Sequence, residues 1–153
     1  MTLRRPQRVK GFSYRGLHRY LLTFCAEGRR EVFVDAAVVE CARTQFQRTA
    51  ADEQFEILAY CLMPDHVHLV IEGLTDDSDL RRFVKIGKQR AAYALWTDHA
   101  LSKVWQEGYH DWVLRPDQNV TEKIRYVLDN PVRAALVTRW DEYPFSGCAY
   151  PLH

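Results

Sequence analysis

The sequence lacks the features of membrane, secreted and zinc-cluster proteins. No apolar run in its 153 residues is long enough to cross a membrane, and the basic N-terminus has no apolar signal-peptide core. Cys25, Cys41, Cys61 and Cys148 form no CxxC pair, which argues against a disulfide framework. Internal repeats and low-complexity tracts are also absent. These absences predict a globular cytoplasmic protein with reduced thiols and no membrane partner.

Acidic residues are missing from the first 26 positions, although the formal net charge of the whole chain is only +1. A second basic set, Arg81, Lys85 and Lys88, falls on one face of a predicted helix. Such charges either form an ordinary solvated face or contact phosphate groups. The candidate phosphate contacts are Arg4, Arg5, Arg81, Lys85, Lys88 and Arg133.

The length of the chain is that of one domain with one substantial hydrophobic core. We expect residues 1–14 to form a basic arm and residues 15–153 to form a single domain. The apolar and charged fractions are those of an ordinary globular protein and select no function by themselves.

Two histidines, His66 and His68, are separated by one apolar residue in a segment that is typical of a β-strand. Side chains alternate along a strand, so both imidazoles leave the same face while Val67, Leu69 and Ile71 point into a core. Two nitrogen donors on a rigid support form half of a site for a divalent metal. The alternative explanation is two histidines on the solvated face of a half-buried strand.

A second unusual pattern lies about sixty residues downstream, at Tyr126 and Asn130. Residues 120–129 have the apolar spacing of a helix, Asn119 precedes them as a cap, and Pro131 ends them. Tyr126 lies far from the apolar stripe, on the same side as Asn130. A partly exposed aromatic residue and a C-terminal helix cap would explain the two residues separately.

These four side chains fit nucleophilic attack on a phosphodiester. A phenol can form a covalent ester with phosphorus and be displaced later, which divides one transfer into two steps. A divalent cation held by two imidazoles and an amide oxygen can polarise the phosphate, and such a donor set suits Mn²⁺ or Mg²⁺.

Four segments resemble those of a known family and occur in the same order. They are LMPDHVHLV (residues 62–70), VWQEGYHD (104–111), RYVLDNPVRAALV (125–137) and YPFS (143–146). The chain resembles the single-tyrosine HUH transposases, and most closely their REP-associated tyrosine transposase branch. The resemblance extends over residues 16–146.

The resemblance implies an α+β fold, an antiparallel sheet with packed helices in a ferredoxin-like HUH nuclease domain. It also implies that His66, His68 and Asn130 bind the metal and that Tyr126 is the nucleophile. Such enzymes cut single-stranded DNA beside a hairpin, form a 5′-phosphotyrosine link and release a 3′-hydroxyl. The sequence is compatible with a homodimer and does not determine whether Tyr126 acts in cis or in trans.

The sequence departs from the family pattern at four positions. Asp65 stands where Asn is usual, Ala135 replaces a common Gly, Phe145 a common Trp, and Gly147 a common Ser. None of these changes removes a catalytic group. Asp65 adds a carboxylate beside the histidines, and Gly147 affects the C-terminal tail.

The remaining pattern predicts an alternation of strands and helices. Strands are expected at residues 18–25, 54–62 and 66–72, with a turn at 63–65 and an extended segment at 103–114. Helices are expected at residues 35–48, 79–96 and 120–129, followed by a short helical piece at 133–137 and an extended tail. For the first helix, the predicted inner face is Ala37, Val38, Cys41 and Phe46.

Three alternatives remain open from the residues. A non-catalytic nucleic-acid-binding domain would use the basic segments alone, and a replication or plasmid-mobilisation nuclease would use another nearby histidine as third ligand. A zinc site could combine Cys61 with the two histidines.

Tyr109, in a segment with Trp105 and Trp112, competes with Tyr126 as nucleophile, although base stacking is an equally good role for it.

Overall fold

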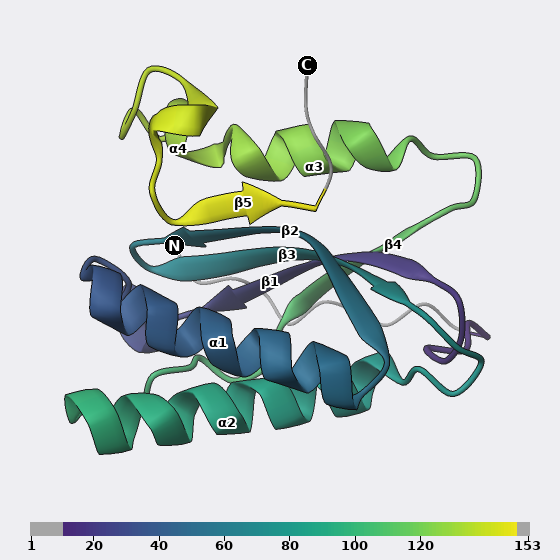
Figure 1. The fold of residues 1–153 in the computed structure, drawn as a ribbon, viewed down its shortest axis with the longest axis horizontal. Helices are drawn as coiled ribbons and strands as arrows, with labels where there is room; N and C mark the ends of the chain where they lie inside the picture. The colour runs from purple at the N-terminus through teal and green to yellow at the C-terminus, as the bar shows by residue number, and fades with distance from the viewer. Residues whose placement is uncertain (1–10, 150–153) are drawn as a thin grey trace.

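The computed structural model describes residues 11–149, which form an α+β fold (Figure 1). The strands are β1 (Arg19–Cys25), β2 (Phe55–Met63), β3 (His66–Gly73), β4 (His110–Leu114) and β5 (Ser146–Cys148). The α-helices are α1 (Ala36–Asp52), α2 (Leu80–His99), α3 (Val120–Leu128) and α4 (Asn130–Arg133), and η1 (Glu27–Arg29) and η2 (Trp140–Glu142) are short 3-10 turns.

The five strands form one antiparallel sheet in the order β4-β1-β3-β2-β5. The helices α1 and α2 cover one face of this sheet and α3 covers the other (Figure 1). The expected antiparallel sheet with packed helices is therefore confirmed. Within residues 11–149, no helix is long and apolar enough to cross a membrane.

Side-chain caps set the starts of the three long helices. Asp35 accepts hydrogen bonds from the backbone amides of Ala37 and Val38, and Asp79 accepts one from Arg82. Asn119 caps α3 as expected, through the amide of Thr121. Each cap satisfies an amide that has no partner within the helix.

The alternating side chains of the sheet supply two separate cores. The larger one lies under α1 and α2 and contains Val67, Leu69 and Ile71, as the strand pattern predicted. The smaller one lies under α3, where Ile124, Val127 and Leu128 pack against apolar residues of β2 and β3. The sheet is thus buried on both faces, and the smaller core fixes α3 over β2 and β3.

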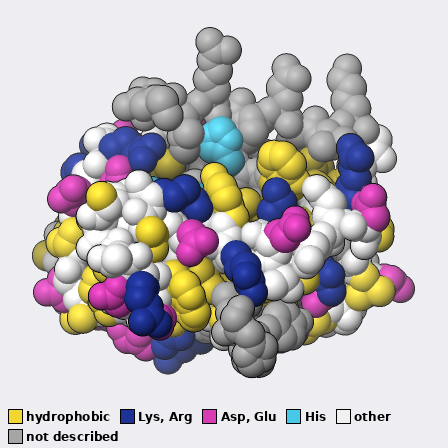
Figure 2. Space-filling view, turned by 90° about the horizontal axis from the view of Figure 1, so that it is seen from above, with side chains coloured by type: hydrophobic (Ala, Val, Ile, Leu, Met, Phe, Trp, Pro, Cys, Tyr) yellow, Lys and Arg dark blue, Asp and Glu magenta, His cyan; other side chains and the backbone are white. Residues whose placement is uncertain are grey.

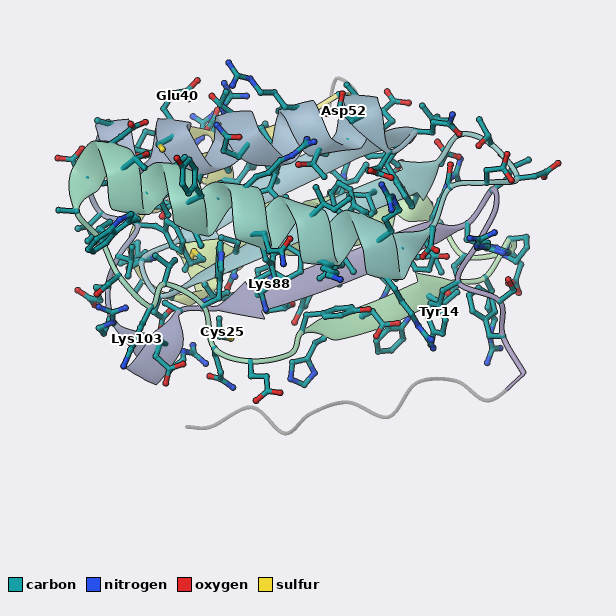
Figure 3. All side chains as sticks on the ribbon, turned by 90° about the horizontal axis from the view of Figure 1, so that it is seen from below. Tyr14, Cys25, Glu40, Asp52, Lys88 and Lys103 are labelled. Carbon is teal, nitrogen blue, oxygen red and sulfur yellow. The ribbon has the colours of Figure 1, made fainter. Side chains whose placement is uncertain are left out.

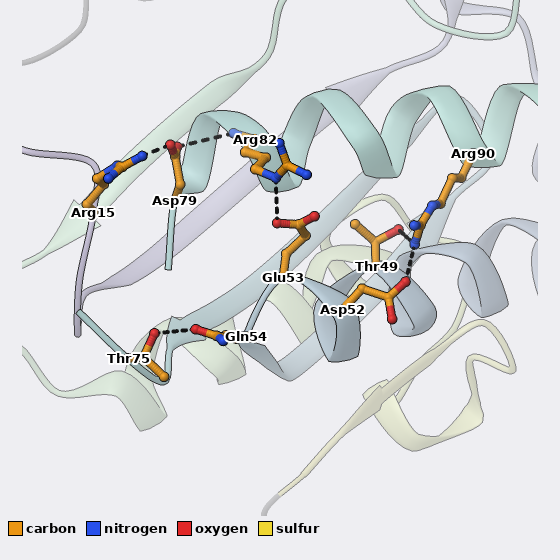
Figure 4. Close-up of polar contacts among 9 residues, drawn as sticks. All are labelled: Arg15, Thr49, Asp52, Glu53, Gln54, Thr75, Asp79, Arg82 and Arg90. Atoms are coloured by element: carbon orange, nitrogen blue, oxygen red, sulfur yellow. Dashed lines mark hydrogen bonds and ion pairs between the residues drawn. The ribbon is translucent and has the colours of Figure 1, made fainter. Parts of the chain in front are cut away.

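The helices α1 and α2 lie side by side beneath the sheet (Figure 3). A Cβ atom at Gly87 would lie 3.0 Å from the Phe46 ring, so glycine permits this close approach. Ion pairs also join the C-terminal end of α1 to α2, Arg82 with Glu53 at 2.9 Å and Arg90 with Asp52 at 2.7 Å (Figure 4).

The structure corrects three local predictions. The helix α1 continues to Asp52 instead of ending at residue 48. Its buried face includes Val39 and Ala42, whereas Ala37 is exposed and Cys41 is half-buried. The short helix after α3 begins at Asn130, not near Arg133, because a proline in its first turn favours initiation. The segment 103–114, expected to be a strand or an irregular edge, combines the two: residues 103–109 are irregular apart from an isolated bridge, and residues 110–114 form a strand.

Candidate active site

His66 and His68 lie on the face of β3 that α3 covers. The ring centroids are 4.7 Å apart and the ring planes meet at 85°. Residue alternation sends Val67 and Leu69 into the opposite core, where both are buried. The strand therefore presents the two imidazoles together, as its pattern predicted.

Both rings are held through the same nitrogen. The Nδ1 atom of His66 lies 2.7 Å from Asp65 Oδ1, and the Nδ1 atom of His68 lies 2.9 Å from Thr23 Oγ1 on β1. The Nε2 atom of His66 faces the Asn130 amide, whose Nδ2 lies 3.2 Å away. This arrangement orients the Nε2 side of His66 toward α4.

Burial keeps both imidazoles neutral at physiological pH. Desolvation lowers the pKa of His66, although the neighbouring Asp65 carboxylate opposes the shift. Burial, together with the charge of His66, lowers the pKa of His68 to about 3. A neutral imidazole is the form that coordinates a metal ion.

Asn130 is the first residue of α4 and does not cap α3. The C-cap of α3 is Asp129, whose amide donates to the carbonyls of Arg125 and Val127. The Asn130 side chain instead points to His66. Helix capping therefore does not account for the asparagine at this position, whereas contact with a histidine does.

Tyr126 lies on the solvent side of α3, and 52% of its surface is exposed. The Arg133 guanidinium stacks over its ring at 4.1 Å from the centroid and also donates to the Tyr126 carbonyl oxygen at 2.7 Å. The positive charge of Arg133 contributes to the low pKa of His68 as well. Arg133 therefore contacts Tyr126 directly and lies close enough to His68 for its charge to act on that ring.

The donor set fits a hard or borderline divalent ion. His66 and His68 offer imidazole nitrogens, and a half-turn of the Asn130 amide would present its oxygen to the same space. Within the part of the chain that the structure describes, no group of three His, Cys, Asp or Glu side chains is placed to hold a metal. Burial also raises the pKa of Cys61 to about 12, which disfavours the thiolate that zinc requires.

The chain matches the family described as "Transposase IS200 like" over residues 15–129. It belongs to the IS200-like transposase family. Among its relatives is a Haemophilus influenzae protein named as a REP-associated tyrosine transposase, 22% identical over 84% of this chain and 78% of the relative. The REP-associated tyrosine transposase of Escherichia coli K12 is 30% identical over 100 residues, 62% of this chain and 55% of the relative.

Two solved structures share the fold of this transposase. A REP-associated tyrosine transposase bound to a REP hairpin superposes with a TM-score of 0.77 at 20% identity, covering 92% of this chain and 82% of the other. A transposase-like protein of Deinococcus radiodurans superposes with a TM-score of 0.56 at 23% identity, covering 82% and 97%. The family expected from the four sequence segments is confirmed.

The basic side chains of the transposase do not form one patch. Arg4 and Arg5 lie outside the described residues, and Arg81 and Lys85 are exposed on α2, on the sheet face opposite the histidines. Figure 2 shows the α3 side, where Lys and Arg side chains are interspersed with acidic and apolar ones. Among the residues that the structure describes, the α3 side therefore carries no uniform positive surface.

Lys88 differs from Arg81 and Lys85, although the helical spacing predicted one shared face. Its ammonium group donates to the carbonyl oxygens of Gln106 and Gly108 at 3.1 and 2.7 Å, on the side of α2 that faces the sheet (Figure 3). Burial lowers its pKa. Lys88 holds the segment 106–108 against α2 and is not on the exposed face.

Tyr109 lies on the wrong side of the sheet to act with the histidines. Its ring packs edge-on against Phe24 at 6.2 Å, in the larger core that also contains Trp105 at its border. Because Phe24 points away from α3, Tyr109 lies on the sheet face opposite His66 and His68, whereas Tyr126 is carried by the helix that covers their face.

Two supporting residues, Thr23 and Arg29, were missed by sequence reasoning. Thr23 contacts His68, and Arg29 contacts Asp65 at 3.0 Å. Asp65 itself was visible only as a departure from the family pattern. Thr23 and Arg29 are remote in sequence from the residues that they contact, so only the sheet register and the η1 turn bring them to the site.

Proposed function

We propose that this transposase cuts and rejoins single-stranded DNA beside a hairpin, through a 5′-phosphotyrosine link at Tyr126. The observation that supports the proposal most strongly is the contact of Asn130 with His66, which gathers three metal-binding side chains on one sheet face. A related transposase of the same fold is bound to a REP hairpin, which supports hairpin DNA as the substrate class. We place the reaction in the cytoplasm.

His66, His68 and Asn130 would hold Mg²⁺ or Mn²⁺. The bound ion would polarise a phosphate oxygen. The chain itself positions the other groups. Tyr126 loses its proton as its oxygen attacks the phosphorus atom, the bond from phosphorus to the 3′-oxygen breaks, and that oxygen takes up a proton. In the reverse direction, a 3′-hydroxyl displaces Tyr126 and joins the strands.

Arg133 is suited to hold the attacked phosphate beside Tyr126. A guanidinium binds two phosphate oxygens at once, and Arg133 already lies over the phenol ring. The remaining proposed DNA contacts are Arg4, Arg5, Arg81, Lys85 and Lys88, which would bind phosphates without reading bases. The bonds of the Lys88 ammonium to two carbonyls weaken the case for that residue.

A covalent-adduct assay tests the proposal. The protein is incubated with a labelled hairpin oligonucleotide and Mn²⁺ or Mg²⁺, and the products are separated under denaturing conditions. We expect a protein–DNA band from the wild type and none from Tyr126→Phe, which removes one oxygen and almost no packing area. Hairpin affinity of the variant should stay within about tenfold, or 1.4 kcal/mol.

Peptide mass spectrometry of the adduct identifies the nucleophile. We expect the nucleotide on the peptide that contains Tyr126, and Tyr109→Phe serves as the matched control with an unchanged adduct yield. A nucleotide on the Tyr109 peptide would overturn the mechanism but keep the enzyme class. If no adduct forms on any substrate with metal present, a non-catalytic nucleic-acid-binding domain becomes the better description.

A further inference from the structure

Asp65 uses its two carboxylate oxygens for two different partners. Oδ1 lies 2.7 Å from Nδ1 of His66, and Oδ2 accepts from Arg29 Nε at 3.0 Å. Both charged side chains of the pair are about 30% exposed, 31% for Arg29 and 28% for Asp65. The carboxylate is therefore oriented from both sides at the edge of the histidine site.

The backbone fixes the same turn. The amide of Ala26 donates to the Asp65 carbonyl at 2.9 Å, and the amide of Phe33 donates to the Pro64 carbonyl at 3.0 Å. The segment that carries Arg29 is thus bonded to the β2–β3 turn at both ends. This attachment keeps the guanidinium beside Asp65 without help from a ligand.

The carboxylate determines which nitrogen of His66 carries the proton. An ionised carboxylate only accepts hydrogen bonds, so a neutral His66 must donate from Nδ1 and keep its lone pair on Nε2. Nε2 is the atom that faces Asn130. An amide at position 65 could present either its oxygen or its NH₂ group to Nδ1, and would not specify the tautomer.

We propose that Asp65, held by Arg29, is a positioning residue that fixes His66 as the Nδ1–H tautomer with Nε2 free to bind the metal. This inference rests on the proposed function, because it concerns the same metal-binding side chains. Outer partners of a ligating histidine raise its basicity and hold its ring, and their loss costs about 10- to 100-fold in metal affinity.

Two measurements without DNA test the role of Asp65. Calorimetric titration with Mn²⁺ should show affinity about 10- to 100-fold weaker for Asp65→Ala and Arg29→Ala than for the wild type. Nitrogen NMR of the histidine rings in metal-free protein should show the Nδ1–H form of His66 in the wild type. In Asp65→Asn, the conservative variant, the same spectrum should show a mixture of both tautomers.

Arg30→Ala is the matched control. Arg30 lies next to Arg29 but donates to the backbone carbonyls of Ser102 and Lys103, so its loss should change Mn²⁺ affinity by less than about twofold. Circular dichroism should show that each variant is folded.

The inference is overturned if folded Asp65→Ala binds Mn²⁺ as tightly as the wild type, or if wild-type His66 carries its proton on Nε2. Either result can occur in a protein that still forms the Tyr126 adduct, which leaves the proposed function intact. A wild-type protein that binds no Mn²⁺ would instead refute the metal site on which both proposals depend.

Discussion

At the scale of single residues, the histidines combine burial with a fixed hydrogen-bond partner. Thr23 holds the ring of His68 through Nδ1, and Asp65 holds that of His66. Buried imidazoles resist protonation because the charged form loses its hydration. The same burial that keeps the rings neutral therefore makes the protein sensitive to acid.

The low pKa of His68 predicts a loss of stability as the pH falls below about 6.5. The unfolded chain takes up a proton near pH 6.5, whereas the folded protein resists it until about pH 3. The resistance of folded His68 to protonation should therefore lower the free energy of unfolding by about 2 kcal/mol at pH 5. Each pH unit below about 6.5 removes about 1.4 kcal/mol. Urea unfolding at pH 7.5 and pH 5, with chelator present, measures this loss.

His68→Gln supplies the comparison, because carboxylates elsewhere also change stability with pH. We expect the wild type to lose about 2 kcal/mol more than this variant between the two pH values. Equal losses in both proteins would show that His68 is protonated in the fold as easily as in the unfolded chain.

The residues that sequence could identify are those whose role follows from local periodicity. The shared face of His66 and His68 and the exposed position of Tyr126 are of this kind. The contact between Arg29 and Asp65 is not, because it joins residues 36 positions apart. Gly147 likewise has its reason in the fold, since a Cβ atom there would lie 2.8 Å from the Tyr60 hydroxyl.

At the scale of elements, α2 carries basic side chains with different surroundings. Arg82 and Arg90 are paired with Glu53 and Asp52 at the end of α1 (Figure 4). The Lys88 ammonium group instead donates to the carbonyl oxygens of Gln106 and Gly108. Helical periodicity placed Lys88 on one face with Arg81 and Lys85. Helical periodicity could not show that residues 106–108 pack against Lys88 and cover it.

Replacing Arg81 and Lys85 together with alanine should weaken binding to every oligonucleotide alike. Each phosphate contact on a single strand contributes about 0.7 to the slope of log affinity against log salt, so the double variant should reduce that slope by about 1.4. Fluorescence anisotropy over a range of salt concentrations measures both effects. The loss of affinity for one sequence only, or an unchanged slope, would contradict phosphate contact.

Arg82→Ala is the control on the same helix. It removes one positive charge from an ion pair with Glu53, so the charge lost was already neutralised locally. We expect the salt slope of this variant to equal that of the wild type within error. A slope reduced as strongly as in the double variant would show that binding follows net charge and not position on α2.

At the scale of the whole molecule, the alternation of strands and helices predicts an α+β domain with helices packed on a sheet. The sequence pattern was sufficient for the antiparallel sheet, but not for the burial of both its faces. The helix α3 packs on the sheet face where Ile124, Val127 and Leu128 contact the apolar side chains of β2 and β3. That choice brings Asn130 to His66, places Tyr126 one helical turn before it on α3, and leaves Tyr109 on the other side of the sheet.

The packing of α3 also predicts that Tyr126 acts in cis. Ile124 and Val127 are fully buried against the same chain, and Asn130 contacts His66 of that chain. Transfer of α3 to a second subunit would replace each of these contacts within the chain by a contact between chains. We therefore expect that mixing His66→Ala with Tyr126→Phe restores no covalent adduct, because neither chain contains a complete site. Recovery of adduct in the mixture, absent from each variant alone, would show that two chains share one active site.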